Sequence, residues 1–124
     1  MTGPLRVYVA GAYSAPSRRQ RSRNVQAATR AARMVVEMGA HPVVPHLVGF
    51  ACEDLQDNWA WWMAATSREL STCDLCVVVP GWELSRGTQA EIRQCTREQR
   101  PIFHLDSDRD VELLRKAINQ GRAA

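Results

Sequence analysis

The segment LCVVVPGWELSRGTQAE, residues 75–91, decides the fold of this chain. Leu75 to Val79 is a short run of apolar, mostly β-branched residues without alternation, which is typical of a central strand buried on both faces of a parallel sheet. Pro80 and Gly81 end that strand, and a helix is expected to begin near Thr88. A buried strand, a glycine-containing loop and a helix are the repeating unit of doubly wound α/β domains.

The same alternation extends along the rest of the chain. It predicts one domain over residues 1–124, a flavodoxin-like or Rossmann-like three-layer αβα sandwich. The parallel sheet has four to five strands in the order 2-1-3-4-5, and the fifth strand is short or lost. Further strands are expected at Leu5–Ala10, Val43–Val44 and Ile102–Leu105. Helices are expected from an Asn24 cap to Gly39, from Asp57 or Asn58 to Ser71, and over Asp108–Asn119, with 46–57 a loop or irregular helical turn.

Composition excludes several classes of protein. The 124 residues carry a formal charge of +3, with 16 Lys+Arg against 13 Asp+Glu, a milder excess than nucleic-acid binders show. No apolar stretch is long enough to span a membrane, and no signal peptide is apparent, so we expect a cytoplasmic protein. Cys73 and Cys76 form a CxxC, but Cys76 lies in a predicted strand and no second pair follows, which favours buried thiols over a metal or redox site.

Much of the basic excess lies in one run, Arg18, Arg19, Arg21 and Arg23. Such a run is either a local phosphate site or the solvated start of a helix, and composition alone favours the second.

Ligands of open parallel sheets bind beyond the carboxyl ends of the strands. That rule brings residues 11–14, 45–46 and 80–91 around one crevice. Gly87, Ser85 and Thr88 supply a tight turn and hydroxyls at a helix N-terminus, which attracts anions, and Glu91 leans back toward the crevice. The alternative is that Ser85 or Thr88 only caps the helix and that Glu91 completes a capping box with Thr88. Local sequence favours that alternative.

Three further features each have more than one interpretation. Tyr8 lies in the first strand, next to the strand at 75–79, so its hydroxyl either reaches Glu91 or bonds to backbone in the core. His46 is a ligand contact, a general acid or an ordinary loop histidine. Trp59 and Trp62, at helical spacing, favour a core or subunit interface over stacking on a base.

Three segments carry a resemblance to a known family. They are VYVAGAYS at 7–14, NVQAATRAARMVVEMGAHPVVPH at 24–46 and CDLCVVVPGWELSRGTQAEI at 73–92. The chain resembles the nucleoside 2-deoxyribosyltransferase superfamily nearly end to end, in particular its small nucleotide N-glycosidases and related uncharacterised domains.

The resemblance implies chemistry at a sugar. Glu91 would attack the anomeric carbon and form a covalent glycosyl-enzyme with retention of configuration, and Tyr8 would orient it. Ser85, together with Ser14 and Arg18 or Arg19, would hold a 5′-phosphate. No metal or organic cofactor is implied.

The chain departs from the family at Thr66. The family has a second carboxylate there, an aspartate eight residues before the aspartate that opens the third strand, here Asp74. Three explanations stay open. Asp57, Glu69 or His46 takes over proton donation, the base leaves without strong acid help, or the domain binds nucleotides without cleaving them.

The sequence therefore predicts an enzyme that hydrolyses or transfers at the N-glycosidic bond of a (deoxy)nucleoside or its 5′-monophosphate, as a homodimer or higher oligomer without a membrane or stable nucleic-acid partner. The alternatives are an inactive nucleotide-binding module, a phosphoribohydrolase of the cytokinin-activating type, suggested by the similar loop after Pro80, and, more weakly, a flavin carrier. Glu91 and Tyr8 are the predicted catalytic residues. The predicted substrate-binding residues are Gly11, Tyr13, Ser14, Arg18, Arg19, His46, Trp82, Ser85, Gly87 and Thr88.

Overall fold

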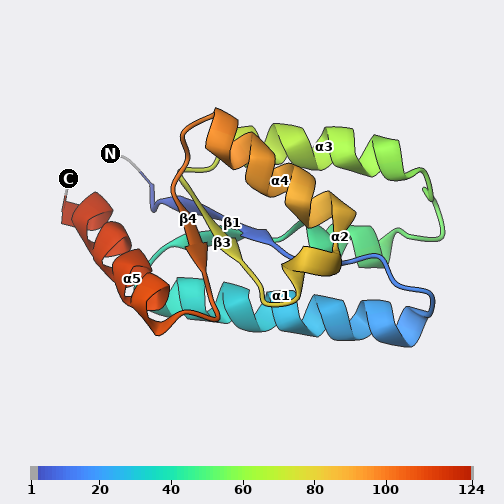
Figure 1. The fold of residues 1–124 in the computed structure, drawn as a ribbon, viewed down its shortest axis with the longest axis horizontal. Helices are drawn as coiled ribbons and strands as arrows, with labels where there is room; N and C mark the ends of the chain where they lie inside the picture. Colours follow the sequence, from blue (N-terminus) through green and yellow to red (C-terminus); the bar gives the residue numbers. More distant parts are fainter. Residues whose placement is uncertain (1–2, 124) are drawn as a thin grey trace.

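The computed structural model describes residues 3–123, whose four strands form one parallel sheet (Figure 1). The strands are β1 (Arg6–Ala10), β2 (His41–Val43), β3 (Leu75–Val78) and β4 (Ile102–His104), and their order is β2-β1-β3-β4. The predicted order is confirmed for these four strands. Residues 3–123 contain no fifth strand, which is one of the two outcomes that the sequence left open.

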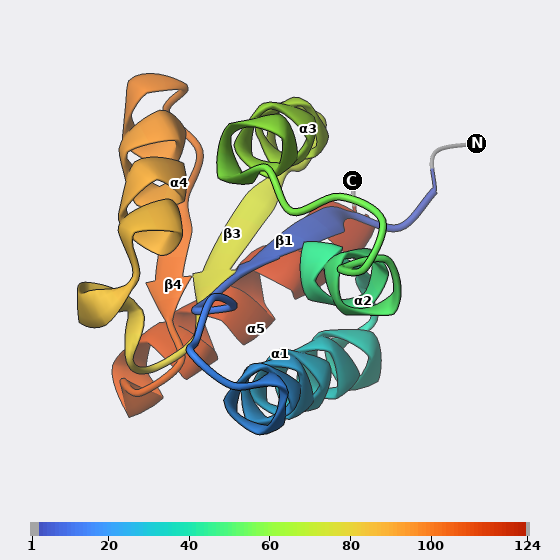
Figure 2. The same cartoon turned by 90° about the vertical axis from the view of Figure 1, so that its right-hand side faces the viewer.

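Helices cover both faces of the sheet, so the predicted three-layer α/β sandwich is confirmed (Figure 2). On one side lie α1 (Arg18–Met38) and α5 (Asp108–Ala123), and on the other lie α3 (Trp59–Ser71) and α4 (Arg86–Arg97). The short α2 (Pro45–Ala51) lies beside α1, and a single 3-10 turn, η1 (Trp82–Leu84), precedes α4.

Alternation along the strands decides which side chains reach which layer. Val7 and Val9 of β1 pack with Val35 of α1 and with Leu114 and Ile118 of α5. Successive side chains of a strand point to opposite faces. Tyr8 therefore points to the other layer, where it packs in the core beneath α3 and α4.

The structure corrects the predicted start of the first long helix. Ser17, not Asn24, is the N-cap of α1, and its hydroxyl accepts a hydrogen bond from the Gln20 N–H at 3.1 Å. Asn24 lies inside the helix, where its amide donates to the Tyr13 carbonyl at 3.0 Å. The apolar periodicity marks only the part of α1 that packs on the sheet, and the first two turns of the helix extend beyond it.

Two other local predictions change. Pro45 begins α2, so much of the segment expected to be a loop or irregular turn is a regular helix with proline at its first position. Ser85 caps α4, which places Glu91 in the second turn. The capping box between Thr88 and Glu91 is therefore wrong.

The tryptophans at the start of α3 are not core residues. Trp59 and Trp61 are 40% and 52% exposed, because this end of α3 extends past the sheet. Trp62 is half-buried, with its indole N–H donating to the Gln56 carbonyl at 2.8 Å. The core interpretation of Trp59 is therefore wrong.

The cysteines are free thiols. Cys73, Cys76 and Cys95 are buried and Cys52 is half-buried, so the prediction of buried thiols for the CxxC is confirmed. Within the described part of the chain, no helix combines the length and apolarity that crossing a membrane requires.

Candidate active site

A cleft of about 870 Å³ opens at the carboxyl ends of β1 and β3. Its walls are the loop after β1, the start of α2, the segment that leads into α3, the first turns of α3, and the loop and helix start after β3. The crevice expected from the topology is therefore present. The structure brings nine of the predicted site residues to its lining, namely Gly11, Tyr13, Ser14, Arg18, His46, Ser85, Gly87, Thr88 and Glu91.

The buried end of the cleft contains a tyrosine and a carboxylate in direct contact. The Tyr8 hydroxyl donates a hydrogen bond to Oε2 of Glu91, which is one of the two interpretations that the sequence left open. Tyr8 is fully buried and Glu91 is 9% exposed. Tyr8 is fixed by the middle strands of the sheet and Glu91 by the second turn of α4, so both side chains stand on rigid elements.

Burial controls the acidity of this pair. Loss of water contact raises the pKa of Glu91 from 4.5 to about 7, although the hydrogen bond from Tyr8 acts in the opposite direction and lowers it. Burial also raises the pKa of Tyr8, and the neighbouring Glu91 charge raises it further. Tyr8 is therefore a neutral donor, and Glu91 changes its charge near neutral pH.

The start of α4 forms one wall next to Glu91. The Ser85 hydroxyl accepts from the Thr88 N–H at 3.2 Å and from the Thr88 hydroxyl at 2.8 Å. Gly87 lies against α3, where a β-carbon would come within 3.3 Å of the Met63 sulfur. The absence of a side chain at Gly87 lets the helix start approach α3 closely.

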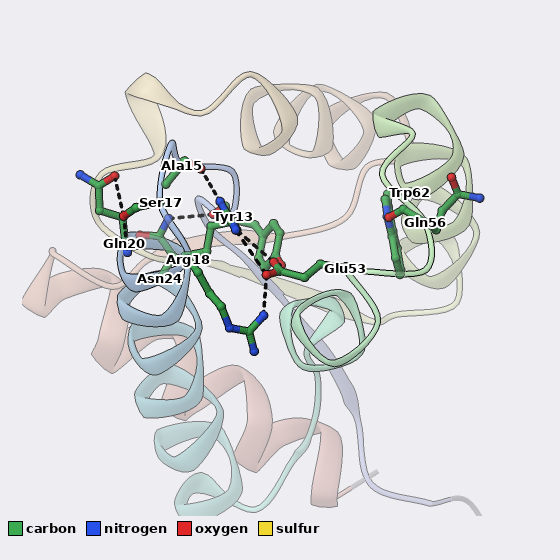
Figure 3. Close-up of polar contacts among 10 residues, drawn as sticks. Tyr13, Ala15, Ser17, Arg18, Gln20, Asn24, Glu53, Gln56 and Trp62 are labelled. Atoms are coloured by element: carbon green, nitrogen blue, oxygen red, sulfur yellow. Dashed lines mark hydrogen bonds and ion pairs between the residues drawn. The ribbon is translucent and has the colours of Figure 1, made fainter.

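The opposite wall holds a second tyrosine and carboxylate, which Figure 3 shows. Glu53 accepts hydrogen bonds from the Tyr13 hydroxyl at 2.5 Å, from Arg18 at 2.6 Å and from the Arg21 Nε at 3.0 Å. Arg21 also donates to the Ala15 carbonyl at 2.9 Å. These contacts join the loop after β1 and the start of α1 to the segment after α2, and we call the four side chains, Tyr13, Arg18, Arg21 and Glu53, the Glu53 cluster.

Charge pairing controls acidity in the Glu53 cluster. Hydrogen bonds from Arg21 and then from Tyr13 lower the pKa of Glu53 from 4.5 to about 2. Burial and the bond to Glu53 raise the pKa of Tyr13 to about 12. At neutral pH Glu53 is therefore ionised and Tyr13 is neutral.

Sequence reasoning missed Glu53 and Arg21 as cleft residues. Glu53 lies in a segment without periodicity, and only the tertiary structure places it opposite α1. Arg21 had a signal, because residues three apart share one face of a helix and Arg18 was already a candidate. The interpretation of the arginine run as a solvated face is wrong for Arg21, which pairs with Glu53 and is only partly exposed.

The first turns of α3 give the cleft an aromatic wall. Trp59 and Trp62 both line it, and the guanidinium of Arg86 lies over the Trp59 ring at 4.1 Å from its centroid. Thr66 lines the cleft one turn further along, with its hydroxyl donating to the Met63 carbonyl at 3.3 Å. The position of the expected second carboxylate therefore does face the cleft.

His46 is buried beneath the loop after β1. Its Nε2 lies 2.9 Å from the Gly11 carbonyl, which can only accept, so Nε2 carries the proton. Burial lowers the pKa of His46, and the ring is neutral. The proton that a general acid would need is thus held by backbone, and the contact fixes the loop that ends at Ser14.

Two predicted residues lie away from the cleft. Arg19 is exposed and follows Arg18 by one residue on α1, a rotation of about 100° to another face of the helix. Trp82 lies in η1 and packs near His104 of β4, with ring centroids 5.5 Å apart. The structure does not bring either side chain to the candidate site.

Across residues 3–123, His, Cys, Asp and Glu side chains form no group of three or more that could hold a metal ion. What the cleft offers is a carboxylate with a tyrosine donor, a helix start with hydroxyls, and an aromatic wall.

Comparison with known proteins gives a family but no activity. No curated protein matches the chain. Residues 5–105 match a family described as a domain of unknown function, DUF7768, and the chain belongs to that family.

Proposed function

We propose that this protein cleaves the N-glycosidic bond of a nucleoside or nucleotide through a covalent intermediate on Glu91. The observation that carries the proposal is the buried hydrogen bond from Tyr8 to Glu91 at the end of the cleft. A carboxylate held by a neutral donor beside a cavity has the position and charge that a nucleophile at an anomeric carbon requires.

The proposed reaction uses few groups. A sugar that loses its base develops positive charge at the anomeric carbon, which the adjacent Glu91 carboxylate stabilises and then captures. The hydrogen bond from the Tyr8 hydroxyl orients the carboxylate by holding Oε2 of Glu91. The other oxygen of Glu91 is then the one that attacks the anomeric carbon. Water, or a second base, then displaces the sugar from Glu91 and gives hydrolysis or transfer.

A 5′-phosphate, where the substrate has one, is proposed to bind at the start of α4 next to Ser85 and Thr88, with Ser14 opposite. Arg18 is already paired with Glu53, although its side chain is 62% exposed and can turn toward an anion. We further propose that the protein forms a homodimer, because Leu55 and Leu84 are 80% and 96% exposed. A cytoplasmic location is proposed on the sequence alone, in which no signal peptide is apparent. Light scattering of the purified protein tests the dimer.

Chemical trapping tests the nucleophile. Incubation with nucleosides and 5′-nucleotides carrying 2-fluoro sugars is expected to leave a glycosyl adduct that mass spectrometry locates on Glu91. An adduct on another residue would overturn the assignment. The same experiment on Glu91→Gln serves as the control, because this variant keeps the shape of the side chain and loses the nucleophilic oxygen.

The second candidate is a nucleotide-binding module without turnover. Thr66 favours it, because the side chain at that place in the cleft wall is a hydroxyl bonded to the Met63 carbonyl and not an acid. Thermal protection by several nucleotides, with no free base released from any of them, would favour binding without catalysis.

A further inference from the structure

Departure of a neutral base requires a proton donor, and few of the groups that line the cleft can fill that role. Glu53 is ionised and accepts four hydrogen bonds, one each from Tyr13 and Arg18 and two from Arg21. The Tyr13 hydroxyl donates to Glu53, and the His46 ring donates to the Gly11 carbonyl. The protons of Tyr13 and His46 are thus engaged in these bonds, and Glu53 carries none.

The hydroxyls nearest Glu91 are engaged as well. Thr66 donates to the Met63 carbonyl and Thr88 donates to Ser85. The remaining carboxylic side chains of the lining, Asp54 and Asp57, are exposed. The cleft therefore has a nucleophile but no buried acid dedicated to the leaving group.

The formal charge of the cleft lining indicates what kind of group the cleft can receive. Among the described residues that line the cleft, four are carboxylic (Glu53, Asp54, Asp57 and Glu91) and three are arginines (Arg18, Arg21 and Arg86). With Glu91 ionised the formal charge of the lining is −1, whereas the whole chain carries +3. With Glu91 protonated the lining is neutral, so in either state of Glu91 the cleft is less positive than the chain as a whole and favours a cationic over an anionic group.

The aromatic wall can also receive a cation. The face of Trp59 already has the guanidinium of Arg86 at 4.1 Å, and Trp62 stands one turn further along α3. Indole rings attract cationic groups through the negative charge of their faces. Because Arg86 already occupies the Trp59 face, Trp62 is the lining tryptophan that a planar, positively charged heterocycle would contact.

We propose that the substrates are N-glycosides whose base carries a positive charge delocalised onto the glycosidic nitrogen or its ring, as in pyridinium nucleosides and N7-alkylated purine nucleosides. This inference rests on the proposed function and names its substrate class. Such bases leave as neutral molecules, so the missing acid is not needed.

The step balances without any further reactant. A Glu91 oxygen forms a bond to the anomeric carbon while the bond from that carbon to nitrogen breaks. The electron pair of the broken bond stays on the base, cancels its positive charge and releases it without a proton. Water then attacks the anomeric carbon, the sugar leaves Glu91 with a hydroxyl group, and one proton passes to solvent.

Substrate pairs test the inference directly. Nicotinamide riboside and 7-methylguanosine carry the charge, whereas uridine and guanosine do not, and nicotinamide mononucleotide shows whether a 5′-phosphate matters. Release of free base is followed by chromatography, with Glu91→Gln giving the uncatalysed background. We expect the charged substrates to be cleaved about 10²-fold faster or more, the range that a general acid contributes.

A gain of function sharpens the test. Thr66→Asp places an acid in the cleft wall near Tyr8, and Thr66→Asn is the matched variant of the same shape without the acid. Thr66→Asp is expected to raise cleavage of guanosine at least about 10-fold and to change cleavage of 7-methylguanosine little. Thr66→Asn is expected to raise neither.

The outcomes separate the inference from the proposed function. If the wild type cleaves guanosine as fast as 7-methylguanosine and also forms the Glu91 adduct, the substrate class is wrong and the proposed function stands. If no substrate is cleaved and no adduct forms, both fail. The comparison of wild-type substrates decides the matter even where a Thr66 variant does not fold.

Discussion

Two glutamates line one cleft, each hydrogen-bonded to a tyrosine, and the pKa values of the two carboxyl groups are shifted in opposite directions. Glu91 accepts a hydrogen bond from Tyr8 and forms no ion pair with any residue that the structure describes, and burial raises its pKa to about 7. Glu53 accepts from Tyr13 together with two arginines, and its pKa falls to about 2. The same two side-chain types therefore give a group that titrates near neutral pH and a permanent anion.

The difference teaches that the tyrosine does not decide the role of the carboxylate. Removing a carboxylate from water disfavours its charged form, whereas an adjacent guanidinium favours it. Burial leaves the Glu91 carboxylate poorly compensated, which is the property that the proposed nucleophile requires. Glu53 forms ion pairs with Arg18 and Arg21, which neutralise its charge and connect the segment after α2 to the start of α1.

The largest expected effect compares the two glutamates directly. Glu91→Gln is expected to lower kcat/KM for a cleaved substrate by on the order of 10³-fold or more, because the nucleophile is lost. Glu53→Gln weakens only the contact between the loop after β1 and the segment after α2, and a loss of about 10-fold is expected from poorer positioning. Steady-state kinetics on both variants checks this, and equal losses would contradict the distinction.

The next largest effect is expected from removing the hydroxyl of Tyr8, which holds Glu91. Tyr8→Phe is expected to lower kcat by on the order of 10-fold to 100-fold, because Glu91 loses its orienting donor. The Tyr8 hydrogen bond lowers the pKa of Glu91, so its loss should also move the midpoint of the rate against pH above about 7.

Tyr13→Phe is the matched control. It removes a hydroxyl from the Glu53 cluster and is expected to cause a small loss in kcat/KM with the midpoint unmoved. A shift of the midpoint in Tyr13→Phe but not in Tyr8→Phe would assign the roles the other way round.

The two glutamates are also expected to change stability with pH in opposite directions. Folded Glu91 holds its proton up to about pH 7, whereas in the unfolded chain it ionises near its ordinary value of 4.5. As pH rises from about 4.5 to 7, the wild type should therefore lose on the order of 3 kcal/mol of stability relative to Glu91→Gln.

The Glu53 contribution has the opposite sign. Its folded pKa is lowered, so its stabilisation is present above pH 4.5 and is lost as pH falls toward about 2. The wild type should then be more stable than Glu53→Gln at pH 7, and the two should converge in acid. Urea unfolding at a series of pH values measures both differences, and parallel curves for wild type and variants would contradict the assigned acidities.

Much of the fold could be predicted because its signals are local. The unbroken apolar run at β3, the glycine after α1 and the prolines around β2 mark strands and helix ends within a few residues. The extra turns at the start of α1 and the helix α2 were missed, because they lie outside the sheet and need no apolar stripe.

Part of the candidate site could likewise be predicted from the sequence, and part could not. Tyr8 and Glu91 could be brought together from the strand order, since β1 and β3 are neighbours and α4 follows β3. Trp82 was misplaced because a turn of three residues, η1, rotates it toward β4. No local sequence pattern predicts the direction in which such a short turn points the side chain.

By itself the sequence determined the parallel sheet, its strand order and the position of one carboxylate at its carboxyl edge, because hydrophobic patterning and turn residues act over short distances. Only the tertiary structure decided the acidities of Glu91 and Glu53, the pairing of Arg18 and Arg21, and the exposure of Trp59. Those properties depend on which groups from distant segments surround a side chain and how much water remains beside it.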